Sequence, residues 1–215
     1  MTKAESRQLL AGTHNAGKVK EIREILRHLP VSVCSLSDYP QLTAVDETGQ
    51  TYEENSKLKA LAYAATTGLT TLADDSGLEV DALGGLPGVK SARFGGDLAS
   101  NDERNAKLLA LLQDEPIERW TARFVCCLTL AGWDTGTADS PTEPLVLSVT
   151  KGVIEGLITS SPAGTNGFGY DPIFVPNGYS ATMAELPTPI KNQISHRAKA
   201  LAAMKPFIER WIGPT

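Results

Sequence analysis

The chain has 215 residues, 41% of them hydrophobic and 21% charged, so it can bury a substantial core without disulfide support. This composition, with Gly and Pro scattered rather than periodic, excludes disordered chains and fibrous repeats. Twenty Lys and Arg residues against 25 Asp and Glu residues give a net charge of −5, so a polyanionic ligand requires a local basic pocket, and nucleic acid is not an expected partner.

The cysteines and the terminal segment indicate the compartment. Cys34, Cys126 and Cys127 are odd in number, and two of them are adjacent in an apolar run, which favours buried reduced thiols. Residues 1–8 are polar, and no apolar stretch approaches the roughly 18 residues of a membrane span. We therefore expect a cytoplasmic protein with no membrane partner.

The first part of the chain alternates apolar runs with helical periodicity. In chain order we expect a strand over 8–13, a helix from Ala16 to Leu29, a strand over 31–36, a polar connection over 37–50, a helix over 51–67 that Gly68 ends, a strand over 70–74 and a loop over 75–96.

The second part predicts two long paired strands between helices. The expected elements are a helix over 101–113, strands over 121–131 and 145–153 with a hairpin loop over 132–144, a glycine-rich stretch over 164–169, a strand over 172–175 and a helix over 192–211. This order predicts an α/β protein whose 215 residues form a single domain, with a mixed sheet and a cleft between two lobes.

The first candidate site is the strand-to-helix turn Thr13-His14-Asn15-Ala16-Gly17-Lys18. The first N–H groups of a helix have no intrahelical partner and attract anions, and Lys18 adds a positive charge. Thr13 and Asn15 can donate to phosphate oxygens, or they can simply cap the helix. The segment is not a Walker loop, because the GxxxxGK[ST] spacing is absent.

The second candidate is the acidic pair Asp74 and Asp75, which follows an apolar strand. Adjacent side chains of a strand point to opposite faces, so both can meet one ion only if the backbone turns, which Ser76 and Gly77 permit. A divalent cation would relieve the repulsion between the two carboxylates. A plain Asx turn is the alternative.

Two polar residues share one face of the helix predicted over 51–67. Asn55 and Lys59 are four residues apart, so an amide and an ammonium could point at one ligand. The pattern alone nevertheless favours a solvated helix face.

Two further candidates lie late in the chain. Phe168 stands between two glycines, which leaves its ring room to lie against a nucleobase, although it could equally be an aromatic anchor in a turn. Lys191, His196 and Arg197, together with Ser195, surround the start of the last predicted helix. Cations are unfavourable there unless an anion is present, and the alternative is a few exposed basic residues.

Together these segments resemble the inosine triphosphate pyrophosphatase family, also called the Ham1-like or RdgB-like non-canonical purine nucleoside triphosphate pyrophosphatases. Five ordered motifs carry the resemblance: TxNxxK at 13–18, ETG and ENxxxKA within 47–60, ADDSGLEVDALGGLPGVKSARF at 73–94, GFGYDPIF at 167–174 and SHRAKAL at 195–201.

The resemblance implies Mg²⁺-dependent hydrolysis of ITP, dITP or XTP to the monophosphate and pyrophosphate. It also implies a two-lobed α/β fold with a long central mixed sheet and an active-site cleft between the lobes, assembled as a homodimer. Ile190 departs from the family, whose members commonly carry an acidic residue before the lysine that matches Lys191. This departure predicts the loss of a local charge pair.

The resemblance also assigns roles to individual residues. Asp75 is the catalytic acceptor of the water's proton and a metal ligand, with Glu47 and Asp74 as further ligands. The implied substrate-binding residues are Thr13, His14, Asn15, Ala16, Gly17, Lys18 and Lys59 at the triphosphate, Ser76 at the nucleotide, Phe168, Gly169, Tyr170 and Asp171 at the base, and Lys191, His196 and Arg197 over base and phosphate.

Two other functions remain open. A Maf-like pyrophosphatase would use the same general chemistry on other modified nucleotides. A nucleotide-binding regulator would keep the phosphate loop without hydrolysis, but it would require lost carboxylates, whereas Glu47, Asp74 and Asp75 are all present.

Overall fold

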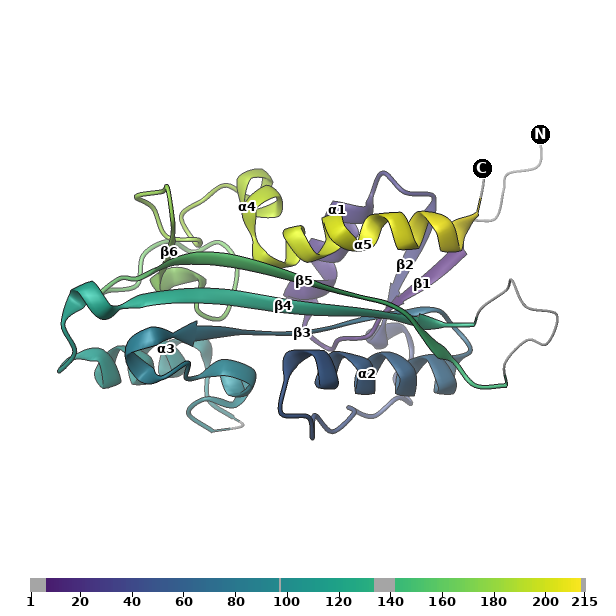
Figure 1. Ribbon diagram of the computed structural model, residues 1–215, viewed down its shortest axis with the longest axis horizontal. Coiled ribbons are helices and arrows are strands. Elements are labelled where there is room, and N and C mark those ends of the chain that lie inside the picture. The colour runs from purple at the N-terminus through teal and green to yellow at the C-terminus, as the bar shows by residue number, and fades with distance from the viewer. Residues whose placement is uncertain (1–6, 97, 134–141, 214–215) are drawn as a thin grey trace. The chain divides into compact units, whose positions relative to one another are not determined.

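The computed structural model describes residues 7–96, 98–133 and 142–213. Its helices and longer strands follow the predicted order closely (Figure 1). In chain order they are β1 (Arg7–Ala11), α1 (Ala16–Leu26), β2 (Val31–Ser35), α2 (Tyr52–Thr67), β3 (Thr71–Val80), α3 (Asn101–Leu112), β4 (Thr121–Gly132), β5 (Leu145–Ile158), β6 (Phe174–Pro176), α4 (Thr188–Ile194) and α5 (His196–Ile212).

The strands form one six-stranded sheet in the order β2-β1-β3-β4-β5-β6. β1 pairs in parallel with β2 and β3, whereas β5 and β6 pair antiparallel, so the sheet is mixed. The predicted α/β fold with a mixed sheet is confirmed, as is the neighbouring pair of long strands, β4 and β5. Residues 134–141, which make up most of the loop predicted over 132–144, lie outside the described residues.

The chain divides into two compact units. The first unit comprises Met1–Asp75, Cys127–Lys151 and Ala200–Thr215, and the second comprises Ser76–Cys126 and Gly152–Lys199. In the first unit α2 lies on one side of the strands, while α1 and most of α5 lie on the other (Figure 1). Single-domain behaviour with a cleft between two lobes stays a prediction.

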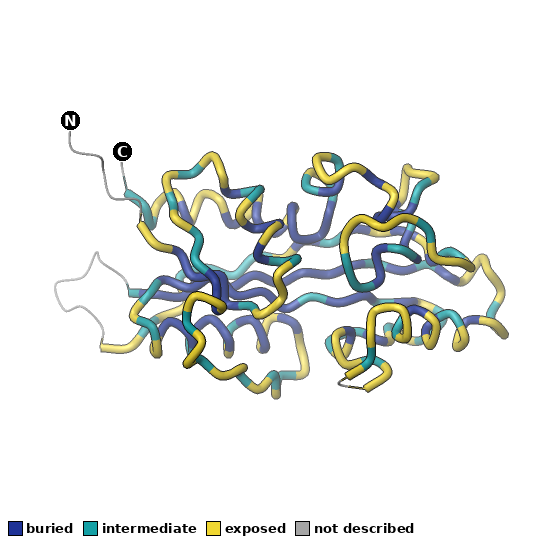
Figure 2. The backbone as a smooth tube through the Cα atoms, turned by 180° about the vertical axis from the view of Figure 1, so that it is seen from behind, coloured by how far each residue is buried: buried dark blue, intermediate teal, exposed yellow. Residues whose placement is uncertain are grey.

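Each unit has its own buried apolar cluster. In the first unit Leu10, Leu36 and Tyr63 pack together, and the apolar residues 9–11 at the end of β1 are fully buried. In the second unit Leu78 and Leu108 belong to a larger cluster. Figure 2 shows the strands as the most continuously buried part of the chain.

Strand β3 is longer than predicted. It continues through Asp74 and Asp75 to Val80, and the expected turn at Ser76 and Gly77 is wrong. The reason is burial: Leu78 and Val80 are fully buried in the second unit's core, at the alternate positions of an extended strand. The two aspartates therefore lie on a continuous strand and point to opposite faces of the sheet.

The predicted C-terminal helix is two helices. Ser195 separates α4 from α5 with an extended backbone at φ −62° and ψ 155°. Its hydroxyl oxygen accepts a hydrogen bond from the Ala198 backbone N–H at 3.1 Å, so the side chain caps the helix that follows. The predicted single helix is wrong because this local hydrogen bond begins a new helix.

The predicted free thiols are confirmed. Cys126 and Cys127 are buried, Cys34 is partly buried, and none of the three forms a disulfide. Within the described part of the chain, no helix is both long and apolar enough to span a membrane.

Gly156 is required where β5 meets β6. A Cβ at this position would collide with the carbonyl oxygen of Val175 and the ring of Phe174. Because the carbonyl belongs to the paired backbone and the ring is fully buried in the second unit's core, we expect Gly156→Ala to lower the free energy of unfolding by about 1–3 kcal/mol. Urea denaturation measures this, with Lys151→Ala on an exposed position of the same strand as the control. Equal stability of the two variants would contradict the packing described here.

Candidate active site

The turn from β1 into α1 is held by two side-chain hydrogen bonds. The Asn15 Oδ1 caps the helix by accepting from the Lys18 backbone N–H at 3.1 Å, and the Thr13 hydroxyl oxygen accepts from the Asn15 N–H at 3.2 Å. The capping interpretation is confirmed for Asn15, and phosphate binding stays a prediction. Thr13, His14 and Ala16 also line a pocket of about 310 Å³ in the first unit.

Asp74 faces α1. Its carboxylate forms a 2.9 Å ion pair with the Lys18 ammonium, and its side chain is fully buried. The neighbouring carboxylate, Asp75, meets Asn55 and Lys59 of α2, as the alternation of an extended strand predicts.

Asp75 faces α2, where two side chains meet it. Asn55 Nδ2 donates to Asp75 Oδ2 at 3.1 Å, and the Lys59 ammonium lies 3.8 Å from Asp75 Oδ1. Lys59 also pairs with Glu47 Oε1 at 2.5 Å. Because Asn55 and Lys59 are both buried, the solvated helix face that the pattern favoured is wrong.

Burial sets the electrostatics of this group. It raises the pKa of the Asp75 carboxyl, and the negative charge of Glu47 raises it further, against the opposing effects of Lys59, Lys18 and the Asn55 hydrogen bond. Burial alone would lower the pKa of Lys59, but the carboxylates of Asp74, Asp75 and Glu47 together raise it. Lys59 is therefore a stable cation, whereas Asp75 is a stronger proton acceptor than an exposed aspartate.

The donor atoms fit a hard divalent cation. Glu47 and Asp75 come from separate segments and meet at one positive charge, and Mg²⁺ in nucleotide enzymes is commonly held by one or two carboxylates plus phosphate oxygens. Across residues 7–96, 98–133 and 142–213, no three His, Cys, Asp or Glu side chains gather as a metal-binding group. The third expected ligand, Asp74, forms the ion pair with Lys18, and its role as a metal ligand stays a prediction.

In the second unit, Asp171 organises the loop around Phe168. Its Oδ2 accepts from the Phe168 backbone N–H at 2.8 Å and pairs with the Lys191 ammonium at 2.7 Å. The Phe168 ring lies 4.9 Å from that ammonium and 5.8 Å from the Arg197 guanidinium carbon. Two cations thus lie close to one aromatic ring.

The late basic residues are buried rather than exposed. Arg197 is 1% exposed and donates to the Ser76 hydroxyl at 3.1 Å, and His196 stacks on Phe124 with ring centroids 4.8 Å apart. The alternative of a few exposed basic residues is therefore wrong. Lys191 has Asp171 as its ion-pair partner, while Ile190 packs against the apolar core.

Three residues that support these predicted positions were missed. Gly167 has a φ of +86°, and a Cβ there would collide with the Asp171 carboxylate. Asn105 Nδ2 donates to the Gly169 carbonyl at 3.2 Å, and the Tyr170 hydroxyl donates to the Ser91 carbonyl at 2.9 Å. The glycine-rich motif could have identified Gly167, but no local pattern points to Asn105 or Ser91.

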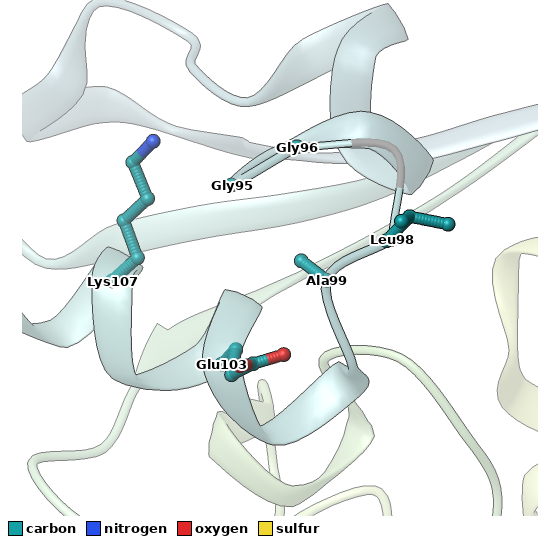
Figure 3. A pocket seen from close by; sticks show the side chains of 6 residues that line it. All are labelled: Gly95, Gly96, Leu98, Ala99, Glu103 and Lys107. Atoms are coloured by element: carbon teal, nitrogen blue, oxygen red, sulfur yellow. The ribbon is translucent and has the colours of Figure 1, made fainter.

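A further pocket of about 580 Å³ lies in the second unit between α3 and the loop that precedes it (Figure 3). Its lining residues are Gly95, Gly96, Leu98, Ala99, Glu103 and Lys107. None of the predicted substrate or metal residues is among them. The Lys107 ammonium lies 5.1 Å from the centroid of the Phe94 ring, so this side chain packs on its own unit's surface.

Comparison with known proteins identifies a protein family whose members are similar to this chain over most of its length. The sequence model of the Ham1 family matches residues 9–207. A dITP/XTP pyrophosphatase of Geobacter sulfurreducens is 48% identical over 198 residues, covering 92% of this chain and 94% of that protein. A dITP/XTP pyrophosphatase of Exiguobacterium sibiricum is 44% identical, covering 96% of this chain and 99% of that protein.

Solved structures agree with the sequence comparison. The Staphylococcus aureus Ham1 protein superposes with a TM-score of 0.78 at 37% identity, covering 95% of this chain and all of that one. The nucleoside-triphosphatase / dITP/XTP pyrophosphatase of Mycobacterium abscessus gives a TM-score of 0.68 at 42% identity, covering 93% of this chain and 99% of that one.

The Asp171–Lys191 pair is buried, so breaking it leaves an uncompensated charge. We expect Asp171→Asn to lower the free energy of unfolding by about 3–5 kcal/mol. The exposed Lys57–Glu53 pair provides the control, where Glu53→Gln is expected to change stability by less than about 1 kcal/mol. Chemical denaturation measures both, and an Asp171→Asn effect as small as that of the control would contradict the assignment of a buried pair.

Proposed function

Because this chain belongs to the Ham1 family, we propose that it hydrolyses the non-canonical purine triphosphates dITP, XTP and ITP to the monophosphate and pyrophosphate. The observation that carries the proposal is the group in which buried Asp75 and partly buried Glu47 share the Lys59 ammonium. Two carboxylates and a lysine from separate segments suit a reaction at a polyphosphate.

The first unit binds the triphosphate in this proposal. The residues from Thr13 to Lys18 surround the start of α1, where backbone N–H groups favour a phosphate, and three of them line a pocket. Lys18 and Lys59 supply positive charge. Because a triphosphate carries about four negative charges, neutralising them is a precondition for attack at phosphorus.

Asp75 is the proposed general base. Its carboxyl has a raised pKa, which favours accepting a proton from the attacking water, and Asn55 fixes its orientation. Glu47 and Asp75 would hold Mg²⁺, with Asp74 as a nearby carboxylate held by Lys18. When bound, Mg²⁺ neutralises phosphate charge and lowers the pKa of water.

The second unit recognises the base. Phe168 offers an aromatic ring, Gly169, Tyr170 and Asp171 continue its loop, and Lys191, His196 and Arg197 supply donors, with Ser76 bonded to Arg197. Hypoxanthine and xanthine present a carbonyl acceptor at C6, where adenine presents an amino donor. A buried donor left unpaired by adenine would disfavour ATP.

Two features weigh against the alternatives. A non-hydrolysing regulator has no need of a buried carboxylate group, yet Asp75 and Glu47 are in place at Lys59. A Maf-like pyrophosphatase is disfavoured because the Ham1 family model matches residues 9–207. The homodimer and the cytoplasmic location remain predictions.

Substrate choice is tested by measuring pyrophosphate release from dITP, XTP, ITP, GTP and ATP, each with Mg²⁺ and with EDTA. We expect rapid turnover of the first three with Mg²⁺, at least about tenfold lower kcat/KM for GTP and ATP, and loss of activity in EDTA that added Mg²⁺ restores. Comparable kcat/KM for all five nucleotides would rule out the selective pocket.

The role of Asp75 is tested by Asp75→Asn, which keeps the side-chain shape and removes the proton acceptor. We expect kcat for dITP to fall at least about 10²-fold. Asp81→Asn, the same chemical change just beyond the end of β3, is the control and is expected to retain normal kcat. Pyrophosphate release from Asp75→Asn at close to the unmodified rate would remove Asp75 from the mechanism.

A further inference from the structure

The segment 45–49, which carries Glu47, runs along helix α2 and makes a γ-turn at Glu47, where the Thr48 N–H donates to the Asp46 carbonyl at 3.1 Å. The connection from β2 to α2 lies beside α2 in Figure 1. Burial alternates along the segment: Val45, Glu47 and Gly49 are partly buried, whereas Asp46 and Thr48 are exposed. Alternate residues of the segment therefore face a neighbouring element, and the γ-turn keeps Glu47 on the same side as Val45 and Gly49.

Each of the three inward residues bonds to α2, in antiparallel order. The Val45 N–H donates to the Tyr63 hydroxyl at 3.2 Å, and the Gly49 N–H donates to Asn55 Oδ1 at 2.8 Å. Between them, Glu47 accepts from the Lys59 ammonium at 2.5 Å. We call these three contacts the α2 ladder.

The three contacts are evenly spaced. Successive contacts are two residues apart along the segment and four residues apart along α2, where four residues rise about 6.0 Å. Residues 45, 47 and 49 therefore stay in register with residues 63, 59 and 55. A single helix face can hold the whole segment.

The same three helix residues reach the predicted catalytic elements. Asn55 Nδ2 donates to Asp75, and Lys59 lies 3.8 Å from the same carboxyl group. Tyr63 contacts His14 of the β1–α1 turn, with 3.4 Å between the hydroxyl oxygen and Nε2. Each of the three contacts thus connects the Glu47 segment, through α2, to Asp75 or to the β1–α1 turn within the first unit.

We propose that Asn55 and Tyr63 are positioning residues, which hold Glu47 in place opposite Asp75 by fixing the backbone on both sides of it. This rests on the proposed function, because it assumes that Glu47 and Asp75 act together on the nucleotide. Both side chains are buried, Asn55 at 1% and Tyr63 at 3% exposure, and Asn55 uses both ends of its amide, so its orientation is fixed.

Gly49 supports this assignment independently. A Cβ at residue 49 would lie 2.6 Å from the Glu54 Cβ and 2.7 Å from the Asn55 Oδ1. Any side chain there would push the segment away from Asn55 and break the hydrogen bond between the residue 49 N–H and Asn55 Oδ1. The glycine is needed for close approach to α2 and not for a left-handed backbone, which it does not adopt.

The test combines hydrogen exchange with steady-state kinetics on the full chain. Tyr63→Phe removes one oxygen and keeps the ring in its apolar cluster, so the fold is expected to survive. Gly49→Ala disturbs the contact between residue 49 and Asn55, at the other end of the α2 ladder. Tyr179→Phe, an exposed tyrosine of the second unit, is the matched control.

In Tyr63→Phe we expect the Val45 backbone amide to exchange at least about tenfold faster than in the unmodified chain. In Gly49→Ala we expect the same for the backbone amide of residue 49. We also expect kcat for dITP to fall about tenfold in both, because the Glu47 carboxylate is misplaced. KM is expected to stay within about twofold in Gly49→Ala, which leaves the β1–α1 turn unchanged, whereas Tyr63→Phe also loses the contact with His14. Tyr179→Phe should match the unmodified chain.

Unchanged amide exchange in both variants would overturn the ladder. Faster exchange with an unchanged kcat would overturn the positioning role. A higher KM and a lower melting temperature with an unchanged kcat would overturn it too. If the unmodified chain hydrolyses no nucleoside triphosphate, the proposed function fails on its own, because the exchange measurement requires no substrate.

Discussion

The site depends on one buried cation. Lys59 interacts with the charges of Asp74, Asp75 and Glu47, and without this cation the burial of Asp75 beside a second carboxylate would be strongly unfavourable. Its placement follows from α2, whose capping box at Thr51 and Glu54 fixes where the helix starts. Because the helix starts there, Asn55, Lys59 and Tyr63 all fall on the face that meets β3 and the Glu47 segment.

Strand β3 divides the charges between two helices. Asp74 and Asp75 are consecutive, so a continuous strand must give one to α1 and the other to α2, and the ion pairs follow this rule. In the proposed function this separates two tasks. Lys18 and Asp74 fix the turn that binds phosphate, while Lys59 and Asp75 form the group that accepts the proton of the attacking water.

The sequence predicted much of this from patterns with a local physical cause. Apolar periodicity located most helices and strands, and five motifs identified the family that the comparisons confirm. The extension of β3 was missed because Ser76 and Gly77 resemble a turn, and only the distant core around Leu78 keeps them extended. The buried state of Asn55, Lys59 and Arg197 was missed for the same reason: their partners are far away in the chain.

The even spacing of the α2 ladder restricts how this protein can vary. Asp46 and Thr48 are exposed and their side chains form none of the three contacts, but inserting or deleting one residue within 45–49 would move Glu47 or Gly49 away from its partner on α2. A change in chain length is therefore better tolerated before Val45, in the connection that follows β2. The contacts with α2 thus constrain the length of this five-residue stretch more than the identity of its two exposed residues.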